Sequence, residues 1–235
     1  MSEDVDRLAQ ERLSAEERRL SRRTTVTLEA TGRAFWRYPS PWMLTANLLA
    51  LVVARVARGG WSLADAWAPL IFLALFPVLE WGIHVFILHW RPRKLAGITV
   101  DSLLAREHRA HHADPRDVPL VFIPWRALIW VIAVYDGLGL LLFPHVGQAL
   151  TFLVTVAVVG LVYEWIHYLI HSDYKPRSRL YKAVWRNHRL HHYKNEHYWF
   201  SVTTSGTSDR LFGTHPDPET VAASKTARNL HGAMD

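Results

Sequence analysis

Hydrophobic residues in this chain gather into four long blocks separated by polar and basic stretches. Two blocks are nearly uninterrupted: Ala66–Leu88 contains Glu80 as its single charged residue, and Val146–Ile170 contains only Glu164. As a helix, each is long enough to cross the hydrocarbon core of a membrane, which takes about 20 residues. Two weaker blocks carry one and two charged residues respectively: Trp42–Ala57 and Val121–Phe143. The pattern predicts four membrane-spanning helices.

A soluble bundle of four core helices is the alternative to this interpretation. A surface helix of such a bundle carries a polar stripe with a period of about 3.6 residues, and the two long blocks lack one. We therefore expect an all-α fold, a four-span transmembrane helical bundle built from two hairpins. Residues 1–40 are expected to form a cytoplasmic N-terminal arm, residues 41–218 the membrane-bound domain, and residues 219–235 a C-terminal tail.

The placement of basic residues orients the predicted bundle. Six Lys and Arg lie between His89 and Leu120 and ten lie beyond His171, whereas none lies between Phe143 and Ala149. Because basic residues in short loops favour the cytoplasmic side, both termini and the ends of the two long blocks are expected there. The net charge of +6 is then explained by topology and anionic headgroups. Membrane lipids are favoured as partners, and nucleic acid is not expected.

The sequence contains no cysteine. Disulfides, thiolate metal sites and cysteine-ligated iron–sulfur clusters are therefore excluded within it, and any metal must be bound through nitrogen and oxygen atoms. The first forty residues contain no apolar segment next to a cleavage site, so no cleaved signal peptide is expected.

A repeated order of histidines follows the two long blocks. The first copy reads Glu80-Trp81, His84, His89, a basic stretch and His108-Arg-Ala-His-His112, and the second reads Glu164-Trp165, His167, His171, a basic stretch and His188-Arg-Leu-His-His192. We infer two helical hairpins related by an approximate two-fold axis, an arrangement that often places a binding site at the interface of the repeats. The candidate metal ligands are His84, His89, His108, His111, His112, His167, His171, His188, His191 and His192.

The spacing of these histidines places them on common helix faces. Residues three and four apart share a face, so His167 and His171 converge, as do the histidines within each HxxHH cluster. His84 and His89 are five apart, which turns about 140° on a straight helix. We therefore expect the helix to end or distort between them, and Pro92 shortly afterwards supports an ending.

Acidic residues inside the apolar blocks are costly and usually have a functional partner. We expect Glu80 and Glu164 to hold an imidazole N–H or a neighbouring arginine. Direct ligation by Glu164 is an alternative, because Glu164-Trp-Ile-His167 matches the Glu-x-x-His motif of carboxylate di-iron bundles. Asp136 either lines a substrate cavity or forms an interhelical hydrogen bond. His197 is either an eleventh ligand or an outer residue, and three histidines are expected not to bind metal: His145, His215 and His231.

Ligand number narrows the chemistry more than ligand type does. Imidazole suits zinc, copper, iron and nickel. A zinc site takes about four ligands, whereas ten histidines can supply two metals with five each. Two redox-capable ions side by side, each with an open position, are suited to binding and cleaving O₂. At the end of an apolar bundle they would meet a carbon atom of a lipid.

The order HxxxxH, HxxHH, HxxxH, HxxHH on a four-span chain resembles the fatty acid hydroxylase and sterol desaturase superfamily of membrane di-iron oxygenases. The segment from His188 to Pro216 is similar to the C-terminal part of the fatty acid 2-hydroxylase branch. The resemblance covers roughly residues 68–218. It is specific for the superfamily and not for a substrate.

The resemblance implies two iron ions held by the ten histidines in a cytoplasmic helical cap. They would insert oxygen from O₂ into a C–H bond of a lipid-like substrate such as a fatty acyl chain, a sterol or a carotenoid. It implies no haem or flavin and no catalytic residues beyond the metal ligands, and zinc in a recombinant sample would be a substitute. We expect a departure from the yeast and animal fatty acid 2-hydroxylases, because 235 residues leave no room for a fused cytochrome b5 domain. Electrons are therefore expected from a separate ferredoxin or cytochrome b5-like protein with its reductase, docked on the basic cytoplasmic loops.

Three alternatives stay open at this point. A desaturase would share the C–H abstraction step on the same scaffold. A divalent-metal transporter or other metal-binding membrane protein would place its ligands near the bilayer midplane, whereas these histidines follow the blocks at one edge. A membrane cytochrome b would need two well-separated axial histidines, unlike the HxxHH clusters.

Overall fold

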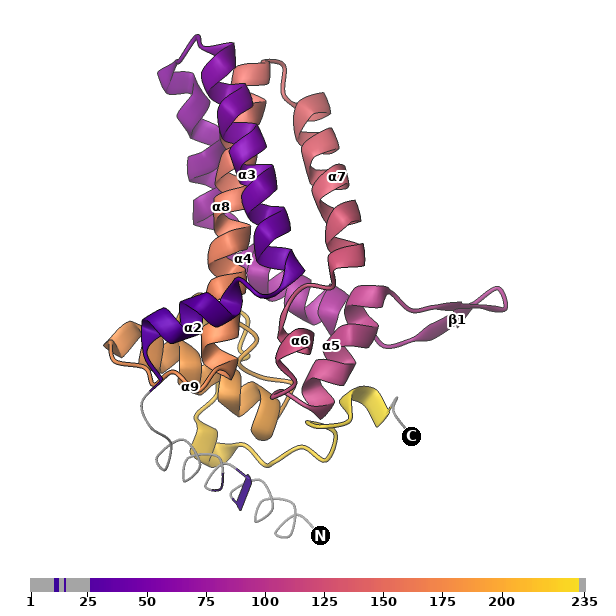
Figure 1. Cartoon of the computed structure of the whole chain (residues 1–235). Helices are drawn as coiled ribbons and strands as arrows, with labels where there is room; N and C mark the ends of the chain where they lie inside the picture. The colour runs from indigo at the N-terminus through magenta and orange to yellow at the C-terminus, as the bar shows by residue number, and fades with distance from the viewer. Residues whose placement is uncertain (1–10, 13–14, 16–25, 233–235) are drawn as a thin grey trace.

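The computed structural model describes residues 11–12, 15 and 26–232, which include all ten candidate ligands. The described chain is mostly helical. The four longest helices stand side by side, and shorter helices gather at one end of them (Figure 1). Most of the N-terminal arm predicted for residues 1–40 lies outside the described residues.

Four helical segments are long and apolar enough to cross a membrane, which confirms the four predicted blocks. Two of them are single helices: α3 spans Pro39–Arg58 and α8 spans Val146–His171. Apolar side chains on the outside of these helices are compatible with a bilayer, because lipid tails are equally apolar.

The other two segments are composite. The second, Leu63–Leu88, runs through a short 3-10 turn, η1, then α4, then a π-helical turn, η2. The third, Val118–Leu142, runs through a short helix, α6, into α7. The bounds of these elements are Leu63–Ala66 for η1, Trp67–Ile83 for α4, His84–Leu88 for η2, Val118–Val121 for α6 and Trp125–Leu142 for α7.

The central helix of the bundle is α8, against which α3, α4 and α7 pack. Leu51 of α3 meets a buried apolar cluster formed by Leu150, Leu153 and Ala157 of α8. Gly139 lets α7 approach α8 closely, because a Cβ atom there would lie 2.6 Å from Leu153 Cδ2. The outer surfaces of α4 and α7 remain apolar and exposed, as a lipid-facing surface requires.

One charged side chain is buried inside α3. The Arg55 guanidinium is paired with Asp65 at 2.5 Å, donates to Thr151 at 2.8 Å, and lies 3.6 Å from the centroid of the Trp61 ring. These partners compensate for the burial of the charge, which is costly when a single ion is left alone in an apolar interior. The group closes the end of the bundle opposite to the histidines.

The end of the bundle that carries the histidines is built from short elements, and we call it the histidine end. Helices α5 (Leu103–Ala113) and α9 (Arg179–Tyr193) each begin at a serine cap, because the hydroxyls of Ser102 and Ser178 accept from backbone N–H groups at 3.1 Å. These two helices carry the HxxHH clusters. The remaining elements are α2 (Leu28–Phe35), β1 (Arg93–Leu95), β2 (Ile98–Val100), α10 (Thr207–Leu211), η3 (Pro218–Thr220) and η4 (Leu230–Gly232).

Candidate metal centre

Four elements bring the histidines together at one end of the bundle. The η2 turn supplies His84 and leads into His89, and the last turn of α8 supplies His167 and His171. The two short helices α5 and α9 supply the HxxHH clusters. Nine of the ten rings belong to buried residues, and His171 is partly buried. The predicted convergence of ligands from both repeats is confirmed as geometry.

The five-residue spacing of His84 and His89 is accommodated by the π-helical turn. The backbone N–H of His89 donates to the carbonyl of His84 at 3.0 Å, so this turn closes over five residues where an α-helix closes over four. Such turns are rare in proteins, and those that occur are often found at functional sites. The wider turn brings both rings to the same centre, which confirms the predicted distortion of the helix.

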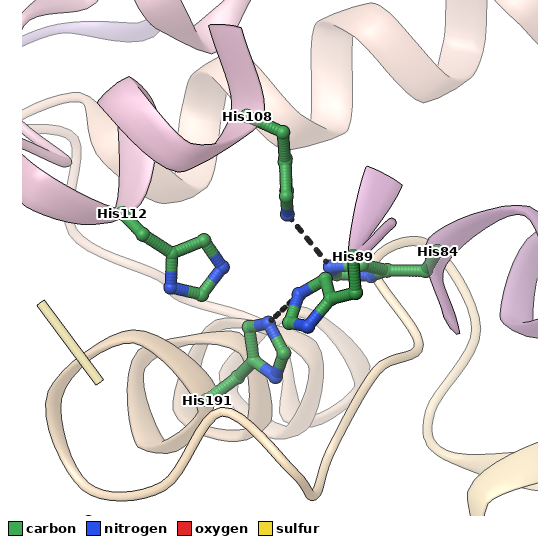
Figure 2. A group of neighbouring side chains, drawn as sticks. All are labelled: His84, His89, His108, His112 and His191. Carbon is green, nitrogen blue, oxygen red and sulfur yellow. Dashed lines mark hydrogen bonds between the residues drawn. The ribbon is translucent and has the colours of Figure 1, made fainter. Parts of the chain in front are cut away.

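The ten side chains form two groups of five, and in each group the candidate ligand atoms lie within 4.8 Å of one another. Figure 2 shows the first group, in which rings from η2, α5 and α9 point toward one another. The members of the first group are His84, His89, His108, His112 and His191. The members of the second group are His111, His167, His171, His188 and His192.

The groups do not follow the two copies of the sequence repeat. Each group contains four histidines of one copy and the middle histidine of the other copy's HxxHH cluster, so that His111 and His191 are exchanged. The exchange ties α5 to α8 and α9 to η2. Neither group can therefore be assembled from one repeat alone.

The nitrogen positions fit metal ions better than they fit hydrogen bonds. In the second group, Nε2 of His188 lies 3.2, 3.0 and 3.0 Å from Nε2 of His167, His171 and His192. A single ring nitrogen donates or accepts one hydrogen bond, so it cannot satisfy three neighbours. Two nitrogens bound at about 2.1 Å to one ion, at right angles, are about 3 Å apart.

Unpaired buried nitrogens give a second indication of metal. Among the described residues, His111 has no hydrogen-bond partner at either ring nitrogen, and His112 has none at Nε2. An unpartnered buried polar atom costs roughly 1–3 kcal/mol. A cation at each centre removes this cost, and the donor set therefore fits a metal pair.

The outer ring nitrogens are held by backbone carbonyls. Nδ1 of His84 donates to Phe200 O at 2.5 Å, and Nδ1 of His191 donates to Tyr198 O at 2.7 Å. Similar bonds join His171 to Pro115 O at 2.9 Å and His112 to Ala227 O at 3.1 Å. A hydrogen bond at one ring nitrogen fixes the tautomer, and the other nitrogen is left with a lone pair for the metal.

Burial keeps the rings neutral. It lowers the pKa of the histidines outside the spanning segments well below the ordinary value of 6.5, to about 3 for His112. Repulsion from neighbouring histidines lowers the pKa further for most of them. A neutral imidazole is the form that binds a metal. The residues concerned are His89, His108, His111, His112, His188, His191 and His192.

The two buried glutamates bond differently from the prediction. Glu80 accepts from the backbone N–H and hydroxyl of Thr203, at 2.6 and 2.5 Å, and from the hydroxyl of Thr204 at 2.8 Å. Glu164 accepts from the hydroxyl of Ser40 at 2.6 Å and from a backbone N–H at 2.9 Å. The expected imidazole or arginine partners were therefore wrong, because distant loops bring their own donors to these carboxylates. Neither glutamate belongs to the two histidine groups.

The remaining predicted residues lie outside the two groups. Asp136 is bonded to Asn47 of α3, which is the interhelical alternative. The exposed ring of His197 lies 3.5 Å from Glu196. His145 directly precedes α8 at the opposite end of the bundle, and His215 lies 3.3 Å from Asn187. Nε2 of His231 donates to the backbone carbonyl of His89 at 2.8 Å.

One residue that the sequence did not single out, Asp209, holds the loop behind the first group. Asp209 is fully buried and accepts from the backbone N–H groups of Phe200 and Ser201 at 2.8 and 2.9 Å. This positions the segment whose carbonyls reach His84 and His191. Asp209 is one acidic residue in a polar stretch, and only its burial distinguishes it from the others.

The C-terminal tail predicted for residues 219–235 reaches back over the centre. Ala227 and Leu230 are buried, and the Arg228 guanidinium donates to the carbonyl of Ala113 at the end of α5. The hydroxyls of Ser224 and Thr226 donate to the buried Glu196. The described part of the tail therefore covers the histidine end.

A small apolar cavity reaches both groups. It has a volume of about 40 Å³ and touches His108 of the first group and His167 of the second. Its other lining residues are mainly apolar and include Leu88, Leu104, Leu120, Phe122 and Ile123.

Comparisons with known proteins agree with this geometry. A family model described as fatty acid hydroxylase matches residues 69–214, a range that contains all ten candidate ligands. A solved structure described as full-length Scs7p, with only the hydroxylase domain visible, is similar with a TM-score of 0.62 and 22% sequence identity. The matched region covers 79% of this chain and 70% of the chain in that structure. At this identity the likeness shows the fold alone. No curated protein matches this chain by sequence.

Proposed function

Because this chain belongs to the fatty acid hydroxylase family, we propose that it is a membrane di-iron oxygenase. It would hydroxylate a C–H bond of a lipid-like substrate with O₂ and with electrons from outside the chain. The observation that carries this proposal is the pair of buried five-histidine groups at one end of an apolar bundle.

Each histidine group would hold one iron ion. Iron bound there supplies the activation of O₂, which the side chains of this protein cannot perform themselves. The five imidazole nitrogens of each group are donors of a kind that suits iron. Zinc would occupy the same nitrogens as an inactive substitute, and the proposal assigns no haem or flavin to this chain.

The side chains around the ions orient the ligands and keep water out. Backbone carbonyls hold the outer nitrogens of several rings, and Asp209 holds the loop that carries two of those carbonyls. Burial keeps the imidazoles neutral, which preserves their lone pairs for the metal. The tail covers the centre on the side away from the bundle.

The apolar cavity supports a lipid-like substrate. It touches one histidine of each group, so a hydrocarbon group that reaches it would lie beside both groups. Its leucine-rich lining favours a hydrocarbon over a polar molecule. A fatty acyl chain, a sterol and a carotenoid all present such carbon atoms.

We further propose that the bundle consists of two hairpins and that the histidine end forms a cytoplasmic cap, with both termini on the same side. The excess of Lys and Arg in the segments of this end supports the orientation. The same basic surface suits an acidic electron donor, a ferredoxin or a cytochrome b5-like protein with its reductase.

A metal transporter fits the structure less well, because the two groups lie at one end of the bundle and not at its middle. A desaturase with the same fold would differ from a hydroxylase in its product. Both reactions begin at a C–H bond, and they differ in whether the lipid gains an oxygen atom or loses two hydrogen atoms.

Mass spectrometry of membrane lipids tests the proposed function. Cells expressing the wild type should accumulate a lipid with one additional oxygen atom, and cells expressing His188→Ala should not. His145→Ala is the matched control, because this exposed histidine lies at the opposite end of α8. A lipid that lacks two hydrogen atoms would redirect the assignment to a desaturase. Identical lipids in wild type and His188→Ala would contradict both reactions.

A further inference from the structure

The hairpin formed by β1 and β2, residues 93–100, projects away from the rest of the molecule. Figure 1 shows it extending sideways from the histidine end, close to the level at which α7 begins. Its two-residue turn places Ala96 and Gly97 at positive φ angles of 49° and 82°. Trp90 ties its base, because the indole N–H donates to the carbonyl of Val100 at 3.1 Å.

The two faces of the hairpin differ in chemistry. Arg93 pairs with Val100 and Leu95 pairs with Ile98, so these four side chains share one face, while Lys94 and Thr99 share the other. The first face is largely apolar and uncovered: Leu95 is 57% exposed, Ile98 is 70% exposed and Val100 is 39% exposed. An isolated two-stranded hairpin is marginally stable in water, so its apolar face calls for a covering surface.

The position of the hairpin and its basic residues indicate which surface covers its apolar face. The hairpin begins shortly after Leu88, the last residue of a spanning segment, so it starts at the surface of the bilayer. Arg91, Arg93 and Lys94 lie at its base and along its first strand. The carboxylate that directly follows the hairpin in the sequence, Asp101, is already paired with Arg109 at 2.6 Å. Basic residues beside a spanning helix are attracted to anionic headgroups.

An aromatic residue marks the same level. The Arg93 guanidinium lies 5.1 Å from the centroid of the Trp90 ring. Tryptophan concentrates at membrane–water interfaces, and long basic side chains reach from apolar surroundings to the headgroups. A lipid surface therefore satisfies the apolar, basic and aromatic groups of the hairpin together.

We propose that the hairpin is a membrane-surface anchor whose face with Leu95, Ile98 and Val100 lies in the headgroup–acyl boundary of an anionic leaflet. The segment that contains it joins His89 to α5, so the anchor fixes the connection between two elements of the first histidine group. This inference rests on the spanning bundle and is independent of which reaction the metal centre performs.

The absence of cysteine from the sequence makes the test direct. Single variants Ile98→Cys and Thr99→Cys of the full chain are labelled with a nitroxide. They are then reconstituted into phosphatidylcholine vesicles with and without phosphatidylglycerol. The accessibility of each label to oxygen, which concentrates in lipid, is compared with its accessibility to a water-soluble nickel chelate. Leu95→Cys is a second position on the apolar face, and retained metal content confirms folding of each variant.

The labels at positions 98 and 95 should be several-fold more accessible to oxygen than to the nickel chelate, most strongly with phosphatidylglycerol, whereas the label at 99 should favour the chelate. Free access of all three labels to the nickel chelate would overturn the proposal, because the hairpin would then stand in water. Protection from both reagents would also overturn it, since a protein surface or a second copy of the chain would be the cover. A label at position 99 in lipid together with a label at position 98 in water would also overturn the proposal, because the opposite face of the hairpin would then be buried.

Discussion

Each proposed ligand has two nitrogens, and the fate of the nitrogen that faces away from the metal decides how well the ring is aimed. Several of the ten rings donate this nitrogen to a backbone carbonyl, among them His84, His112, His171 and His191. Histidine identity and spacing were visible in the sequence. The carbonyl partners were not, because every residue has a carbonyl and only the fold selects which ones face a ring.

The substitution Asp209→Asn, which replaces one carboxylate oxygen by an NH₂ group, tests whether this loop orients the histidines of the first group. The carboxylate now accepts from two backbone N–H groups, one at each oxygen. The amide would turn an NH₂ group toward one of them and displace the loop behind His84 and His191. Loss of such an outer partner weakens metal binding by about 10- to 100-fold.

Metal release to a chelator measures the effect of Asp209→Asn. One of the two ions should be released faster than in wild type, and the other should be unchanged. Glu219→Gln, at an exposed carboxylate of η3, should leave both ions as in wild type. Two unchanged ions in Asp209→Asn would show that the loop does not orient the first group.

At the level of elements, short segments adapt the long helices to the centre. The π-helical η2 turn aims two histidines that a straight helix would separate, and the serine caps start α5 and α9 at equivalent places. The tail, which lies beyond residue 214 where the family match ends, also contributes contacts around the centre. It bonds to His112, to the end of α5 and to the backbone of His89.

Arg228→Ala tests the contribution of the tail. The guanidinium donates through two nitrogens to the carbonyl of Ala113, next to His112, and its removal leaves that carbonyl unpaired. A lost bond of this kind costs roughly 1–3 kcal/mol. We expect the tail to open more often and metal to be released to a chelator several-fold faster.

Lys225→Ala is the matched control for Arg228→Ala, because Lys225 is an exposed cation of the same segment. It should release metal at the wild-type rate. Equal rates for all three proteins would mean that the tail covers the centre without retaining the ions.

At the level of the whole molecule, the sequence predicted the four spanning helices, the repeat and the convergence of the histidines. These features follow from local periodicity and from the spacing of residues on one helix. The exchange of His111 and His191, the partners of Glu80 and the path of the tail were not predictable. They depend on contacts between segments far apart in the chain, for which composition and spacing carry no signal.

Paired substitutions test the exchange of histidines between the repeats. His84→Ala with His191→Ala removes two ligands of one group, so one ion of wild-type affinity should remain. His84→Ala with His111→Ala removes one ligand from each group, so neither ion should keep wild-type affinity. Competition with a chelator measures both. The reverse result would assign the ions to the separate repeats.

The metal content of the purified, iron-loaded wild-type protein tests the central claim most directly. Two closed groups of five imidazoles should hold about two metal ions per chain. The variants His84→Ala with His191→Ala and His145→Ala, measured in parallel, should hold about one and about two. A wild-type value of one ion per chain or fewer, after full iron loading, would contradict a paired metal centre.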